Sequence, residues 1–173
     1  MKRDFARNHF ELLGMPVSFA VDPSRLENSY RELQSQVHPD RFAASTEAER
    51  RMAMQWATAV NEAYRTLRDP TDRARYILSL KGYDTQEETN TSMPADFLMQ
   101  QMEWREAVAE ARATRDARTL REVLARLGNE RRDMLVVLGR ALDTDSNYEA
   151  GRSLVRKLRF LEKLEDEIEE ALE

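Results

Sequence analysis

The chain has 173 residues and a formal net charge of −5, from 27 basic and 32 acidic side chains. This balance excludes a broadly basic nucleic-acid-binding protein. Only five Gly and five Pro occur, Val and Ile are few, and helix-forming residues dominate, which is typical of an all-α protein. Hydrophobic residues make up 41% of the chain. We therefore expect a packed core rather than a disordered chain.

The chain contains no cysteine. It can therefore form no disulfide, thiolate nucleophile or Cys-ligated zinc or iron–sulfur centre of its own. Its two His residues are far apart in sequence, so we expect neither a metal site nor a cofactor. The longest apolar run, 134–138, is far shorter than the roughly twenty residues that cross a bilayer. With no evident secretory signal, we expect a cytoplasmic protein without membrane association.

A long amphipathic helix is predicted after residue 22. Asp22 and Pro23 have the residue types of an N-cap and a first helical position. Pro39 disfavours helical dihedrals at His38, so the helix should end near Val37 and the next residues should form a loop. One apolar stripe follows the helical spacing of four, three and four residues: Leu26, Tyr30, Leu33 and Val37.

A second long helix is predicted to begin at Thr46, because Glu49 three residues later completes a capping box. It should pair antiparallel with the first. Its expected core face consists of Met52, Trp56, Ala59, Ala63 and Leu67. Short amphipathic segments flank this hairpin, one around Phe10 and Leu13 and the other after Asp69-Pro70, with Ala74, Ile77, Leu78 and Leu80.

The polar stretch 82–94 has little apolar periodicity and is predicted to be a linker. Three helical patterns follow, at roughly 95–113, 117–142 and 148–172, and they predict a three-helix bundle. We therefore expect an N-terminal domain at 1–81 and a C-terminal bundle at 95–173. The bundle is the more acidic of the two.

The tripeptide His38-Pro39-Asp40 is the sharpest chemical feature. No paired carboxylates, Gly-rich phosphate loop or second His surround it in sequence, so an acid–base catalytic role is disfavoured and no catalytic residue is assigned. Taken alone, a Pro between polar residues after a helix end is common in loops. The tripeptide acquires weight only from its context.

That context is the following helix, which carries AVNEAYRTLRDP at 59–70 and then TDRARYIL at 71–78. Together with YREL at 30–33 and the loop, these segments resemble a J-domain over about residues 8–81. The resemblance implies that His38, Pro39 and Asp40 are presented to the ATP-bound form of an Hsp70, whose ATPase is stimulated, while this chain is not an enzyme. It further implies that the partner-facing helix binds through basic residues, which here are Arg25, Arg31 and, after the loop, Arg41.

The second half of the chain resembles the HscB family. The carrying segments are FLMQQMEWREAVAE at 97–110 and VRKLRFLEKLEDEIEE at 155–170. In that family the J-type co-chaperone binds the iron–sulfur scaffold protein IscU through its C-terminal bundle and brings it to the specialised Hsp70 HscA. The resemblance implies both partners for this chain.

A helical wheel of 97–111 separates a core stripe from a second apolar face. The stripe contains Phe97, Trp104, Val108 and Ala111, and the second face contains Leu98, Met99 and Met102, adjoined by Glu103, Glu106 and Glu110. In the last helix Phe160 lies about 120° from the apolar stripe. These residues could fill a wide core or pack on the first domain. The resemblance favours scaffold binding, because the family's scaffold-binding positions map onto the same seven residues: Leu98, Met99, Met102, Glu103, Glu106, Glu110 and Phe160. We expect them to be largely exposed.

The sequence thus predicts a two-domain all-α adaptor that recruits an iron–sulfur scaffold to an Hsp70. The alternative is a general J-protein that delivers unfolded clients to Hsp70. The chain has neither the Gly/Phe-rich linker nor the Cys-rich zinc module of such proteins. A purely structural helical protein with an incidental loop is the third possibility.

Overall fold

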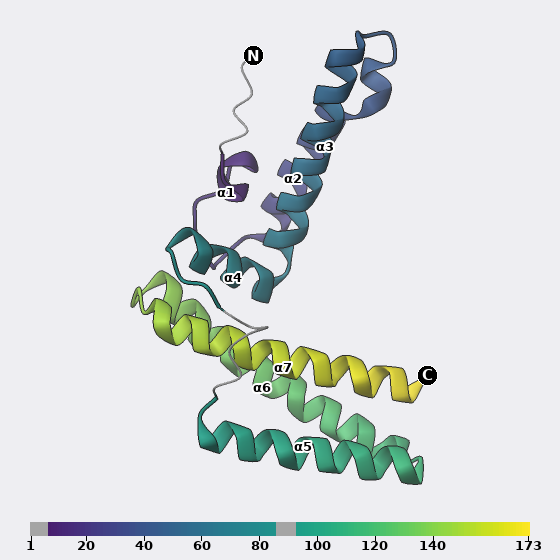
Figure 1. The fold of residues 1–173 in the computed structure, drawn as a ribbon, viewed down its shortest axis with the longest axis vertical. Coiled ribbons are helices and arrows are strands. Elements are labelled where there is room, and N and C mark those ends of the chain that lie inside the picture. The colour runs from purple at the N-terminus through teal and green to yellow at the C-terminus, as the bar shows by residue number, and fades with distance from the viewer. Residues whose placement is uncertain (1–6, 86–92) are drawn as a thin grey trace. The chain divides into compact units, whose positions relative to one another are not determined.

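A computed structural model describes residues 7–85 and 93–173 (Figure 1). The described residues contain no β-strand, and the prediction of an all-α protein is confirmed. They form seven α-helices and one 3-10 helix: α1 (His9–Leu12), α2 (Pro23–Val37), η1 (Pro39–Phe42), α3 (Glu47–Arg68), α4 (Pro70–Leu80), α5 (Ala95–Thr114), α6 (Ala117–Asp143) and α7 (Tyr148–Leu172). The chain divides into two compact units, one ending at Ile77 and the other beginning at Leu78.

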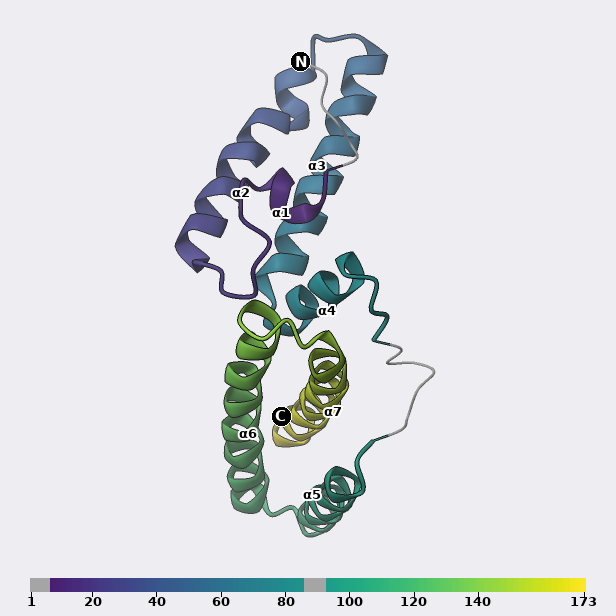
Figure 2. The ribbon, with the colours of Figure 1, turned by 90° about the vertical axis from the view of Figure 1, so that its left-hand side faces the viewer.

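The first unit is built on the hairpin of α2 and α3, which lie side by side in Figures 1 and 2. Both helices begin as predicted. The Asp22 carboxylate accepts the backbone N–H of Ser24 at 2.9 Å, with Pro23 at the first helical position. At the start of α3, Thr46 and Glu49 form the reciprocal capping box. These caps satisfy backbone groups that have no partner within the helix, and thereby fix where each helix starts.

An aromatic pair joins the two helices of the hairpin. The rings of Tyr30 on α2 and Tyr64 on α3 are stacked, with 4.1 Å between centroids and 13° between planes. The Tyr30 hydroxyl donates to the Asn61 side-chain oxygen at 2.9 Å. The contact joins the middle of α2 to the C-terminal half of α3, and the two helices run antiparallel as predicted (Figures 1 and 2).

The core face of α3 differs from the predicted one at two of its five positions. Met52, predicted to lie in the core, is 53% exposed, and Ala59 is only half-buried. The buried residues follow a strict helical spacing of three and four: Ala53, Trp56, Val60, Ala63 and Leu67. Met52 is about 100° from Ala53 around the helix and lies at the edge of this stripe rather than inside it.

The short flanking helices close the hairpin. Phe10 of α1 and the adjacent Leu13 are buried, as predicted. The ring of His9 stacks on Tyr76 of α4, with centroids 4.3 Å apart, and its backbone N–H donates to the Tyr76 hydroxyl at 2.9 Å. Burial lowers the pKa of His9 below its usual value, while the negative charge of Glu62 opposes this shift.

Three of the four apolar residues predicted for α4 are buried, namely Ala74, Ile77 and Leu78. Leu80 is 41% exposed, which corrects its assignment to the apolar face. It is the last residue of the helix, which ends before Gly82. That glycine has φ 82°, a left-handed conformation that glycine adopts without strain. Most of the predicted linker at 82–94 lies outside the described residues, so the boundaries of the two domains stay a prediction.

The second unit contains the three predicted helices, α5, α6 and α7. Its core is mostly aliphatic, and six side chains of α6 and α7 have no exposed surface: Leu127, Leu138, Val155, Leu158, Leu161 and Ile168. A partly buried ion pair also joins α6 to α7, with 3.2 Å between Arg131 Nε and Glu165 Oε2. Burial raises the pKa of Glu165, and the charge of Arg131 offsets this only in part. None of the described helices is both long and apolar enough to span a bilayer.

Candidate partner-binding surfaces

The tip of the hairpin is not the irregular loop that the sequence predicted. His38 is extended and ends α2, and Pro39 begins the 3-10 helix η1. Pro39 has no N–H to leave unpaired, and its fixed φ suits a first helical position. The imidazole Nδ1 of His38 accepts the backbone N–H of Asp40 at 3.3 Å, and the His38 carbonyl accepts that of Arg41 at 3.1 Å. His38 therefore caps the turn that displays its neighbours.

Both polar side chains of the tripeptide face solvent. The side chain of His38 is 53% exposed and that of Asp40 is 91% exposed, with 3.5 Å between Nδ1 and a carboxylate oxygen. Because Nδ1 accepts a backbone hydrogen bond, the neutral ring carries its proton on Nε2. The tip thus offers an N–H donor and a carboxylate to a partner. In the parts of the chain that the structure describes, no group of His, Asp and Glu residues could hold a metal ion.

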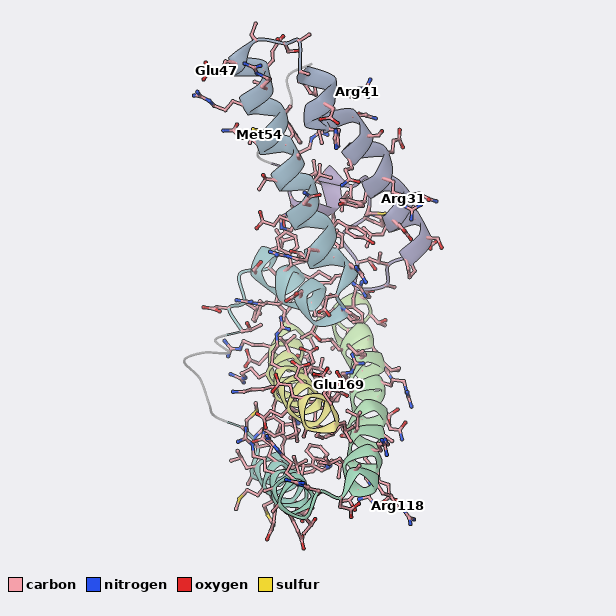
Figure 3. All side chains as sticks on the ribbon, turned by 90° about the vertical axis from the view of Figure 1, so that its right-hand side faces the viewer. Arg31, Arg41, Glu47, Met54, Arg118 and Glu169 are labelled. Atoms are coloured by element: carbon pink, nitrogen blue, oxygen red, sulfur yellow. The ribbon has the colours of Figure 1, made fainter. Side chains whose placement is uncertain are left out.

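The three predicted basic contacts do not form one group. Figure 3 shows Arg31 and Arg41 on the α2 side of the hairpin that ends in the tip. Arg41 donates to the Ser35 carbonyl at 3.2 Å, which holds it beside the end of α2, and Arg31 pairs with Glu27. Arg25 instead donates to the Gly14 carbonyl at 3.1 Å. Its guanidinium is thereby tied to the segment before α2.

A continuous apolar surface lies on α5. Leu98, Met99 and Met102 are 42%, 66% and 70% exposed, which confirms their predicted exposure. Their spacing of three and four residues makes them neighbours on one side of the helix. Three exposed carboxylates continue this side, and none has a hydrogen-bonded or ion-paired side-chain partner among the described residues: Glu103, Glu106 and Glu110. We call the surface formed by these six residues the α5 face.

Phe160 on α7 is half-buried, so the prediction that it is largely exposed is wrong. Its ring meets that of Phe97 on α5 edge-on, with 5.9 Å between centroids. Trp104, expected in the core, is also half-buried and meets Phe97 edge-on at 6.3 Å. A helical wheel describes one helix at a time and therefore cannot show that Phe160 points to α5 rather than to solvent. Phe160 lies in the seam between the two helices.

Two basic side chains near this seam, Arg105 and Lys157, were not predicted from the sequence. Arg105 Cζ lies 5.3 Å from the centroid of the Phe160 ring, and Lys157 Nζ lies 5.1 Å from that of Phe97. Arg105 follows Met102 by three residues, and Lys157 precedes Phe160 by three. This helical spacing is the available signal, but most basic residues on helices are ordinary solvated ones, so the spacing alone does not single these two out.

Both surfaces lie in parts of the chain that match known protein families. Residues 8–76 match the family described as DnaJ domain, and residues 93–169 match the HSCB C-terminal oligomerisation domain. A co-chaperone protein HscB homolog of Burkholderia vietnamiensis is 50% identical over 161 residues, which cover 93% of this chain and 91% of that protein. The chain belongs to the HscB family of co-chaperones. The tip lies in its J-domain, and the α5 face lies in its C-terminal domain.

Solved structures of the HscB family share the fold. The chaperone HscB from Vibrio cholerae has a TM-score of 0.87 and 40% identity, with 94% of this chain and 96% of that chain covered. Human co-chaperone HscB has a TM-score of 0.91 and 29% identity, with 96% and 83% covered. The predicted family and the all-α architecture of a J-domain with an HscB-type C-terminal domain are confirmed.

Proposed function

We propose that this chain binds an iron–sulfur scaffold protein of the IscU type through the α5 face and Phe160. It delivers the scaffold to a specialised Hsp70 of the HscA type and stimulates the ATPase of that chaperone through His38, Pro39 and Asp40. In this proposal the chain hydrolyses nothing itself and acts in the cytoplasm, the reducing compartment that suits a chain without cysteine.

One observation carries the proposal: the α5 face exposes three large apolar side chains beside three unpaired carboxylates. Water disfavours such apolar surface, and Met adapts to irregular partner surfaces. Unpaired carboxylates at the margin attract a partner with basic groups around an apolar spot. These features suit a folded protein partner. An unfolded client would need a broader and less specific apolar surface.

The Hsp70 part is tested at the exposed tip. His38→Gln and Asp40→Asn should each abolish stimulation of the Hsp70 ATPase in a single-turnover assay. Both positions are exposed, so the melting temperature should barely change. Glu47→Gln, which removes a carboxylate 80% exposed at the start of α3, is the matched control and should stimulate as the wild type does. Stimulation by well-folded His38→Gln at the wild-type level would contradict the proposal.

The scaffold part is tested by titrating purified IscU-type scaffold into the full chain in a calorimeter. Leu98→Ala and Met99→Ala should each weaken binding about tenfold or more, as truncation of an interface anchor does. A second assay measures whether the chain suppresses aggregation of unrelated denatured proteins. Broad suppression together with no scaffold binding would favour the alternative of a general co-chaperone.

A further inference from the structure

Arg105 borders the α5 face on the side opposite its carboxylates. At about 100° per residue, the order around α5 from the buried stripe is Arg105, then Leu98 and Met102, then the three glutamates with Met99 among them. Arg105 also follows Leu98 by seven residues and Met102 by three, so the three side chains are neighbours along one side of the helix. The exposed apolar strip therefore has a positive margin as well as a negative one.

The aromatic seam holds this positive margin in place. The Arg105 guanidinium lies over the Phe160 ring at 5.3 Å, and the Lys157 ammonium lies over the Phe97 ring at 5.1 Å. Both distances are within the roughly 6 Å over which a ring attracts a cation. The two rings are themselves in edge-on contact at 5.9 Å. The cations are thus positioned from two helices by one aromatic cluster.

Neither cation is neutralised by the chain itself. Among the residues described by the structure, Arg105 and Lys157 take part in no ion pair with a carboxylate. Other arginines of this unit do form such pairs, as Arg152 does with Glu149 at 2.7 Å and Arg159 with Glu162 at 2.9 Å. Because no carboxylate of the described residues pairs with them, these two positive charges stay available to an acidic group of a partner.

We propose that Arg105 and Lys157 form the positive pole of the docking surface. The partner then presents an acidic group on one side of its apolar spot and basic groups on the other. Docking in the reversed direction would place like charges opposite each other at both margins, which is costly at an interface. Arg105 is therefore an orientation-determining residue. This inference rests on the proposed scaffold binding and specifies the charge pattern that the scaffold must carry.

The test is calorimetric titration of purified IscU-type scaffold into full-length variants at low and high salt. Arg105→Glu should weaken binding at low salt by about tenfold or more, and Arg105→Gln should weaken it by less. Arg105→Lys keeps the positive charge and should keep most of the wild-type affinity. Arg126→Glu on α6, which is exposed and outside this face, makes the same charge change and should leave affinity unchanged. Raising the salt should shrink the loss caused by Arg105→Glu.

Whether Arg105→Glu weakens or strengthens scaffold binding tests the positive pole. A uniformly basic partner surface would bind Arg105→Glu more tightly, so equal or tighter binding overturns the inference. If Arg105 only supports the Phe160 ring, Arg105→Gln and Arg105→Glu should lose affinity equally and independently of salt, which also overturns it. Leu98→Ala distinguishes a failure of the positive pole from a failure of scaffold binding. If it weakens binding while Arg105→Glu does not, scaffold binding stands and the positive pole fails; if Leu98→Ala has no effect, scaffold binding itself fails.

Discussion

The ring of Phe160 on α7 meets the ring of Phe97 on α5 edge-on, with 5.9 Å between centroids and 82° between planes. Phe97 is only 3% exposed, so Phe160 touches the bundle core on one side and lies near the α5 face on the other. A side chain in this position contributes both to the packing of α5 on α7 and to any surface formed there.

Phe160 and Leu98 should consequently separate stability from binding. Phe160→Ala should lower the free energy of unfolding by about 1 to 3 kcal/mol, less than full burial would cost, and should also weaken scaffold binding. Leu98→Ala should change stability by no more than about 0.5 kcal/mol while still weakening binding. Urea unfolding and scaffold titration of the same samples measure both quantities. A stability loss for Leu98→Ala equal to that for Phe160→Ala would show that Leu98 is a packing residue.

Two of the three glycines inside the bundle helices, Gly128 and Gly151, should respond oppositely to alanine. A Cβ added at Gly128 on α6 would lie 3.9 Å from Glu165 Oε1, an ordinary contact. Gly128→Ala should therefore gain about 0.5 to 1 kcal/mol from helix propensity. At Gly151 on α7 the added Cβ would lie 2.8 Å from Leu142 Cδ2. Both residues are buried, so overpacking of about 1 to 3 kcal/mol should exceed the propensity gain. Thermal melts of the two variants test the difference, and stabilisation by Gly151→Ala would show that Leu142 can move aside for the methyl group.

The corrected core face of α3 gives a prediction for the first unit. Met52→Ala should cost no more than about 0.5 kcal/mol, because the side chain is 53% exposed. Leu67 has no exposed surface, and Leu67→Ala should cost about 2 to 5 kcal/mol. Denaturant unfolding followed by circular dichroism measures both. A large loss of stability in Met52→Ala would show that Met52 does belong to the core face, as the sequence predicted.

The His9 pair with Tyr76 predicts a pH dependence. Burial lowers the pKa of His9 in the folded state, so the unfolded state binds the proton more readily. Stability should be fully present above the ordinary histidine pKa of about 6.5 and should fall as the pH drops through that value toward the lower folded pKa. His9→Phe preserves a ring for the stack but cannot titrate, and should flatten this decline. Urea unfolding at about pH 7.5 and about pH 5, on either side of that ordinary value, provides the comparison, and an unchanged decline in His9→Phe would assign it to another group.

Much of the fold follows from local sequence chemistry. The starts of α2 and α3 are set by Asp22 with Pro23 and by Thr46 with Glu49, because a cap needs only residues within one helical turn. The exposure of Leu98, Met99 and Met102 is likewise predictable, since one helix offers the core a single stripe. The motifs of the hairpin and of the last helix are sufficient to indicate the family.

Contacts between helices require the tertiary structure. Helical periodicity places Phe160 off the stripe of α7, but only the position of α5 decides that its ring meets Phe97. The same holds for Arg105 and Lys157, whose charges gain a fixed place from rings on the opposite helix. It holds again for Gly151, where the neighbouring Leu142 leaves no room for a methyl group. Capping and periodicity are properties of residues close in sequence, and the sequence determines them directly, whereas the partner of a side chain across a helix interface depends on how separate segments pack.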